Sequence, residues 1–165
     1  MSRTYIYAVQ SVQTGYYIIS TEGDVAGQNV ATADGNGGLP AGTFLNFNKV
    51  LADNTTDVTI KGASGLYVAL PEVFSFTPSS STLSNLGYKQ NATSGSKLVW
   101  SNDAANWQVD NTSGVYEIFP EGQDLYWMTD KATGPTVEVK KGSEVIEKEN
   151  KWTITRIDRE ERASA

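Results

Sequence analysis

One four-strand pattern occurs three times along this chain of 165 residues. The second strand of the pattern reads GYYII at residues 15–19, GLYVA at 65–69 and DLYWM at 124–128. The fourth strand reads LNF at 45–47, WQV at 107–109 and WTI at 152–154. A pattern that returns after about 50 residues indicates a repeat architecture, whose units share one scaffold. The loops that differ between the units are then the places where function is expected.

Twelve short strands, separated by turn-forming residues, account for the pattern. We expect them at residues 5–10, 16–21, 29–33, 44–50, 57–61, 66–70, 97–101, 106–110, 115–119, 125–129, 136–140 and 151–157. Three units of four strands predict an all-β fold, the β-trefoil, in which six strands close a barrel and six form hairpins that cap one end. A β-sandwich would also contain alternating strands, but it would give no reason for the triplication.

The length fits a single β-trefoil domain with one core. We expect the units at about 4–54, 55–113 and 114–158, followed by a charged tail at 159–165. Two sets of three residues are expected at equivalent core positions: Tyr17, Tyr67 and Tyr126, and Leu45, Trp107 and Trp152. A long insertion at residues 71–96 in the second unit is rich in Ser, Thr, Asn and Pro, and loops of that length are usually functional or flexible.

Composition excludes several classes of function. The net charge of −6 disfavours binding to nucleic acid and to anionic membranes. The chain has no cysteine and no histidine, so mechanisms that need either residue are ruled out, and we expect no enzyme. Asp34 opens a sequence similar to a calcium loop, but Leu45 stands where the closing glutamate would be, so we expect no metal and no cofactor. The absence of a hydrophobic leader predicts a cytoplasmic protein.

A glycine-dense connection at residues 34–42 is the first candidate binding site. Glycines leave the backbone without bulky side chains, so such a segment can enter a narrow protease cleft and pair main chain to main chain. Its candidate contact residues are Gly35, Asn36, Gly37, Gly38, Leu39 and Pro40. An ordinary long hairpin loop is the alternative. Basic side chains that could enter a trypsin-like pocket are Lys89, Lys140 and Lys141, although most such lysines are solubilising surface.

Aromatic residues beside amides and carboxylates form the second candidate site. Sugars stack their C–H faces on aromatic rings and use Asn and Asp to bind their hydroxyls. If Tyr126 faces the core, Trp127 points away from it, because neighbours on a strand alternate. Trp100 stands close to Asn102 and Asp103 in the sequence and offers the same chemistry. The alternative is that both tryptophans only pack within the protein.

The layout resembles the β-trefoil proteins of mushroom fruiting bodies, down to the terminal strand KWTITRI at residues 151–157. These include mycocypin-like cysteine protease inhibitors, related serine protease inhibitors and ricin-B-like lectins. The resemblance to mycocypins implies binding of papain-like enzymes through two loops of the first unit, which here contain Gln13, Thr14 and Gly15 and the glycine-dense connection. Ricin-type lectins carry Gln-x-Trp in each repeat, and here Asn150, Lys151 and Trp152 are the nearest match.

The leading hypothesis from the sequence is therefore a defence protein that inhibits papain-like cysteine proteases without covalent chemistry. A preorganised loop on a rigid barrel loses little entropy when it docks, which favours such binding. Another loop could bind a second class of protease. The alternative hypothesis is a fungal lectin that binds glycans through the tryptophan clusters.

Overall fold

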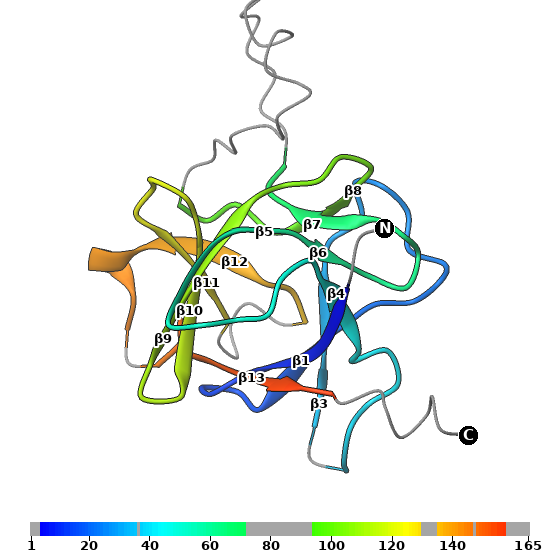
Figure 1. Cartoon of the computed structure of the whole chain (residues 1–165), viewed down its shortest axis with the longest axis horizontal. Helices are drawn as coiled ribbons and strands as arrows, with labels where there is room; N and C mark the ends of the chain where they lie inside the picture. The colour runs from blue at the N-terminus through cyan, green and yellow to red at the C-terminus, as the bar shows by residue number, and fades with distance from the viewer. Residues whose placement is uncertain (1–3, 36, 72–93, 130–134, 147, 158–165) are drawn as a thin grey trace, which may run out of the picture.

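The barrel is a closed ring of antiparallel strands in the computed structural model, which describes residues 4–35, 37–71, 94–129, 135–146 and 148–157 (Figure 1). On one side of β1, strand pairing runs from β1 to β4 and β6. On the other side it runs from β1 through β13, β10 and β9 to β5, which directly precedes β6 in the chain. The strands are β1 (Tyr5–Ser11), β4 (Leu45–Phe47), β5 (Asn54–Val58), β6 (Ile60–Lys61), β9 (Trp107–Thr112), β10 (Val115–Pro120) and β13 (Trp152–Arg156). The first and last strands lie side by side, so both ends of the described chain belong to one ring.

A bulge splits the fifth predicted strand into β5 and β6. The register between β5 and β9 shifts between Thr55 and Val58, and Asp57 between them has a φ of 56°. That left-handed conformation is uncommon outside glycine. The backbone N–H of Asp57 donates to Glu121 Oε2 at 2.8 Å. A side chain of the third unit therefore satisfies the N–H group at the bulge. Each of the other predicted strands overlaps one observed strand.

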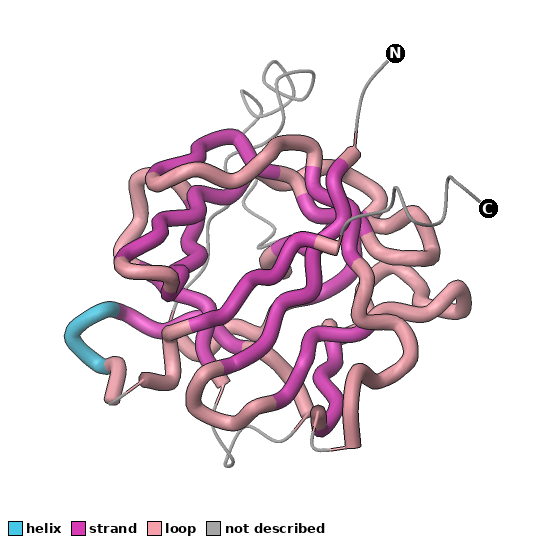
Figure 2. The backbone as a smooth tube through the Cα atoms, turned by 60° about the horizontal axis from the view of Figure 1, so that its bottom comes forward, coloured by secondary structure: helices cyan, strands magenta, loops and turns pink. Residues whose placement is uncertain are grey.

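Three hairpins form the cap: β2 (Tyr16–Ile19) with β3 (Ala31–Asp34), β7 (Tyr67–Ala69) with β8 (Val99–Ser101), and β11 (Leu125–Met128) with β12 (Glu138–Lys141). Isolated bridges join each hairpin to the next: Asn29 with Val99, Lys97 with Glu138, and Thr136 with Ala31. The cap is therefore tied together as a triangle. Figure 2 shows the strands of the whole chain in magenta, from a second side.

The core consists of triplets of equivalent residues. Leu45, Trp107 and Trp152 are completely buried, which confirms that predicted set. The predicted tyrosine set is wrong: Tyr17, Tyr67 and Tyr126 are only half-buried. The buried hairpin residues are those one position later: Ile18, Val68 and Trp127. Because strand neighbours alternate, placing these apolar side chains inward leaves each amphipathic tyrosine on the outer face, where its hydroxyl stays close to water.

Two tryptophans join the barrel to the cap through equivalent hydrogen bonds. Trp107 Nε1–H donates to the carbonyl of Val68 at 3.0 Å, and Trp152 Nε1–H donates to the carbonyl of Trp127 at 3.1 Å. Both bonds are buried, so each satisfies a donor and an acceptor that water does not reach. The first unit has Leu45 at this position, which offers no such donor.

We expect Trp152→Phe to lower the free energy of unfolding by about 2 kcal/mol or more, because it leaves the buried carbonyl of Trp127 without its donor and removes ring volume from the core. Urea unfolding followed by circular dichroism measures the change. Thr153→Ala, at an exposed position on the same strand, is the control and should leave the stability almost unchanged. Equal stability of Trp152→Phe and the parent protein would contradict this account of the core.

Candidate functional site

The three half-buried tyrosines mark equivalent positions on the outer face of the cap. Each lies beside one residue of a neighbouring barrel strand. Gln10 pairs with Tyr17, and Lys61 pairs with Tyr67 with its ammonium 5.2 Å from the ring centroid. In the third unit the neighbour is Phe119, whose ring centroid lies 5.1 Å from that of Tyr126 at an interplanar angle of 57°. Of these three positions, only that of the third unit has two aromatic rings in contact.

The residue two positions before each tyrosine also differs. In the first two units it is Gly15 or Gly65, with φ of 78° and 88°, a conformation that side chains rarely adopt. In the third unit it is Asp124, and Gly122 takes the positive φ of 76° instead. The turn of the third unit therefore places its left-handed glycine earlier. That change frees position 124 to carry an exposed carboxylate.

Asp124 and Tyr126 are coupled. The phenol hydrogen-bonds the Asp124 carboxylate. Burial raises the pKa of Tyr126 above 10.0, and the charges of Asp124 and Glu117 raise it further. The hydroxyl is therefore protonated at neutral pH and donates to the carboxylate. The second oxygen of the carboxylate, and the lone pairs of the phenol, are acceptors that a ligand hydroxyl could use.

Gly142 closes one side of this group. A Cβ atom at position 142 would lie 2.8 Å from Asp124 Oδ1 and 3.1 Å from Tyr126 Cε2, so only glycine lets the backbone approach so closely. Gly142 begins the short 3-10 helix η3 (Gly142–Glu144), directly after β12. We call Phe119, Asp124, Tyr126 and Gly142 the third-unit site. It contains two aromatic rings, one carboxylate and a backbone wall.

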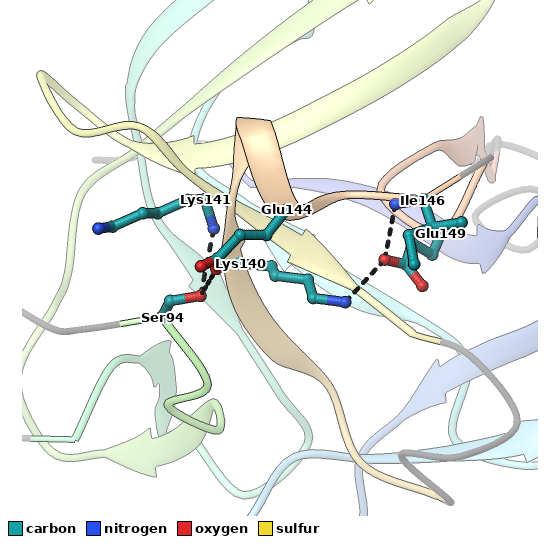
Figure 3. A network of polar contacts seen from close by, with 6 residues as sticks. All are labelled: Ser94, Lys140, Lys141, Glu144, Ile146 and Glu149. Carbon is teal, nitrogen blue, oxygen red and sulfur yellow. Dashed lines mark hydrogen bonds and ion pairs between the residues drawn. The ribbon is translucent and has the colours of Figure 1, made fainter.

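A polar network holds η3 in place (Figure 3). Ser94, at the end of the long connection of the second unit, donates its hydroxyl to Glu144 Oε1 at 2.5 Å and accepts from the backbone N–H of Lys141 at 3.3 Å. One serine thus fixes both ends of the turn that carries Gly142. The third-unit site is therefore braced by a residue of the second unit.

The same view shows why Lys140 is a poor candidate for a protease pocket. Its ammonium forms an ion pair with Glu149 at 3.1 Å, and that carboxylate is almost completely buried. Glu149 also accepts from the backbone N–H of Ile146 at 2.9 Å. Removing Lys140 from this pair would leave a buried charge unpaired, which is costly. The side chain of Lys141 is exposed and points away from the network, whereas Lys89 lies outside the described residues.

The β1–β2 turn, one of the two loops predicted to bind a protease, is held by its own polar groups. The backbone N–H of Gly15 donates to Ser11 O at 2.9 Å, and that of Thr14 donates to Ser11 Oγ at 3.0 Å. Thr129 of the third unit donates its hydroxyl to the same Ser11 Oγ at 3.0 Å. Gln13 is exposed at the tip of this turn.

The β3–β4 connection touches that turn. A Cβ atom at Gly35 would lie 2.5 Å from the ring of Tyr17 and 3.0 Å from the carbonyl oxygen of Gly15, so the two loops meet here. Gly38 N–H donates to Gly35 O at 3.1 Å and tightens the connection. Gly37, Gly38 and Leu39 are exposed and Pro40 is half-buried, whereas Asn36 lies outside the described residues. The structure thus brings both predicted protease-binding loops together.

Both tryptophans of the predicted sugar-binding site belong to the core. Trp127 is 0% exposed and Trp100 is 1% exposed, so neither presents a ring face to a ligand. The prediction that they could stack on a sugar is therefore wrong. For Trp127, the cause is the inverted assignment of Tyr126. Ring contacts of Trp127 with Trp107 and Trp152, at centroid distances of 4.9 and 6.3 Å, hold it in place. Asn102 and Asp103 are exposed.

The sequence reasoning missed Phe119 and Asp124. Asp124 was visible as the first letter of DLYWM, where the other two units have glycine. Comparing aligned repeats for the one acidic exception would have found it. Phe119 could be found only through its ring contact with Tyr126 of β11, which the sequence does not reveal. No group of metal-ligating side chains occurs among the described residues, and no helix among them is long and apolar enough to cross a membrane.

Comparisons with known proteins identify the fold. No family model matches this chain, and no curated protein matches it in sequence. Among solved structures, the lactose complex of the Macrolepiota procera ricin B-like lectin has a TM-score of 0.60 at 17% identity and covers 95% of this chain and 99% of that one. The Rhizoctonia solani agglutinin has a TM-score of 0.64 at 14% identity, with coverages of 95% and 98%. ThreeFoil, a designed protein with threefold symmetry, has a TM-score of 0.62 at 12% identity, with coverages of 92% and 99%. These likenesses show that the chain is a β-trefoil.

Proposed function

We propose that this β-trefoil binds carbohydrate without catalysis, through the third-unit site. The observation that carries the proposal is the departure from threefold symmetry at one position of the cap. Two equivalent tyrosines have glycine in the preceding turn and Gln10 or Lys61 alongside, whereas Tyr126 has Asp124 and Phe119. Aromatic and acidic groups are thus concentrated at one of three otherwise similar places.

The chemistry of this site suits a sugar ring. The apolar C–H face of a sugar stacks on an aromatic side chain, and Phe119 and Tyr126 meet at a tilt that offers two adjoining surfaces. The hydroxyls of a sugar are strong donors to a carboxylate, and charged acceptors form the stronger hydrogen bonds. Asp124 stands beside Tyr126 with its carboxylate exposed. Gly142 and the Ser94 network hold these groups in place before binding, which lowers the entropic cost of binding.

The structural neighbours support this reading over the protease hypothesis. The Macrolepiota protein is described as a lectin in complex with lactose, and the Rhizoctonia protein as an agglutinin. Tyr126, which is half-buried, takes the place of its buried neighbour Trp127 as the aromatic residue that would contact the sugar. One site per chain is expected, because Gly15 and Gly65 leave the other two tyrosines without a carboxylate at this position.

Asp124→Asn should weaken glycan binding by about tenfold, because a neutral amide accepts a hydrogen bond less strongly than a carboxylate does. A glycan array identifies the ligand, and calorimetry with that glycan measures its affinity and a stoichiometry of one site per chain. Asp103→Asn is the matched control: it removes the same charge from an exposed position in the second unit and should leave the affinity unchanged. Equal losses in both variants, or no glycan binding by the parent protein, would refute the proposal.

A second function has one specific observation in its favour. The two first-unit loops predicted to block papain-like proteases lie against each other, with Gly35 packed on Gly15 and Tyr17. Leu39 projects from the longer loop with 55% of its surface exposed, an apolar group that a protease subsite could accept. These loops belong to the first unit, so this activity would be separate from sugar binding.

If the first-unit loops inhibit a papain-like protease, Leu39→Asp should raise the inhibition constant by about tenfold or more, because it places a charge in an apolar subsite. Inhibition of papain by the two proteins measures the difference. The melting temperature should stay unchanged, since Leu39 is exposed. Absence of papain inhibition by the parent protein would eliminate this second function and leave carbohydrate binding untouched.

A further inference from the structure

We infer that the third-unit site selects glycans whose bound end is neutral and rejects those that end in an acidic group such as a sialic acid or a sulfate. The inference rests on the proposed carbohydrate binding and adds the class of ligand. It follows from how the charges around Tyr126 are paired.

Two lysines around the site are held in ion pairs, and both of their side chains are partly exposed. Lys140 lies directly across from Tyr126 in the β11–β12 pairing, but its ammonium is bound to Glu149. Lys151 forms an ion pair with Glu117, which also accepts from Asn150 Nδ2 at 3.0 Å. These are the two ion pairs that the described residues form within the salt-bridge distance. These two ammoniums are therefore already paired when a ligand arrives. Lys141, directly before Gly142, is exposed, and its side chain points away from the Ser94 network.

In the described part of the chain, carboxylates outnumber unpaired ammoniums around the site, with Asp124 and Glu144 against Lys141. Asp124 is exposed, and among the described residues it forms no ion pair with a lysine or arginine. Its bond to Tyr126 comes from a neutral phenol and does not cancel the charge. Glu144, at the end of η3, is likewise bound by the neutral hydroxyl of Ser94. A sugar on the two rings thus meets a carboxylate whose charge is not compensated.

This arrangement discriminates by charge. A carboxylate accepts hydrogen bonds from neutral sugar hydroxyls but repels a second carboxylate or a sulfate. Two like charges about 4 Å apart weaken binding by about fivefold even in a water-like medium, and by more where water is excluded. The net charge of −6 adds repulsion at longer range. Salt screens this repulsion but does not screen stacking, so the discrimination should shrink at high ionic strength.

Matched pairs of glycans on one array test the inference, each pair differing only in a terminal sialic acid or a sulfate. The parent protein should bind the neutral member at least about fivefold more tightly at low salt, and the ratio should fall in about 1 M salt, where screening acts within about 3 Å. The readout is this ratio, so a general loss of affinity in a variant does not affect it.

Three variants identify the charge responsible. Asp124→Asn should reduce the ratio towards one, whereas Asp103→Asn should leave it unchanged. Lys151→Gln removes the partner of Glu117 and should increase the ratio. Equal binding of both members of the pairs, or tighter binding of the acidic members, would overturn the inference while leaving carbohydrate binding intact. If no glycan of either kind binds, the proposed function itself fails, and the inference fails with it.

Discussion

Closure of the barrel is the constraint on which the rest of the structure depends. The pairing of β1 with β13 brings the first described strand against the last, and without it the strand ring would have two open edges. The buried triplet Leu45, Trp107 and Trp152 fills the inside of this ring. The two indole N–H groups then bond carbonyls of the cap hairpins, so barrel and cap support each other. The side chains that fill this core differ from those that face outward on the cap, such as Tyr17, Tyr67 and Tyr126.

Because the unit occurs three times, the outer surface has three equivalent positions at which a binding site could form. The cap hairpins present Tyr17, Tyr67 and Tyr126 at equivalent places, but their neighbours have diverged. A left-handed glycine at the start of the hairpin suits the turn in the first two units and prevents a side chain there. The third unit moves the left-handed residue to Gly122, and an acid can then stand beside the tyrosine. A small change of turn geometry thus distinguishes the proposed site from scaffold.

The fold could be predicted because a β-trefoil produces a regular spacing of strands and a threefold repeat, and both are visible in a single sequence. The triplet Leu45, Trp107 and Trp152 was found because large apolar residues recur at one position of the repeat. The tyrosines were assigned to the wrong face because in GYYII and GLYVA either phase of the strand gives an apolar face. A one-residue shift in phase then turned Trp127 outward in the prediction. Contact of Phe119 with Tyr126, which joins different strands, could not be read from spacing alone.

The central claim is that the third unit alone carries the ligand. A crystal structure of the chain with the best neutral glycan from the array tests it most directly. The account predicts one sugar ring stacked on Phe119 or Tyr126, with a hydroxyl bonded to Asp124 and no sugar at Tyr17 or Tyr67. A sugar bound at either of those two tyrosines, or on the first-unit loops with the third-unit site empty, would contradict it.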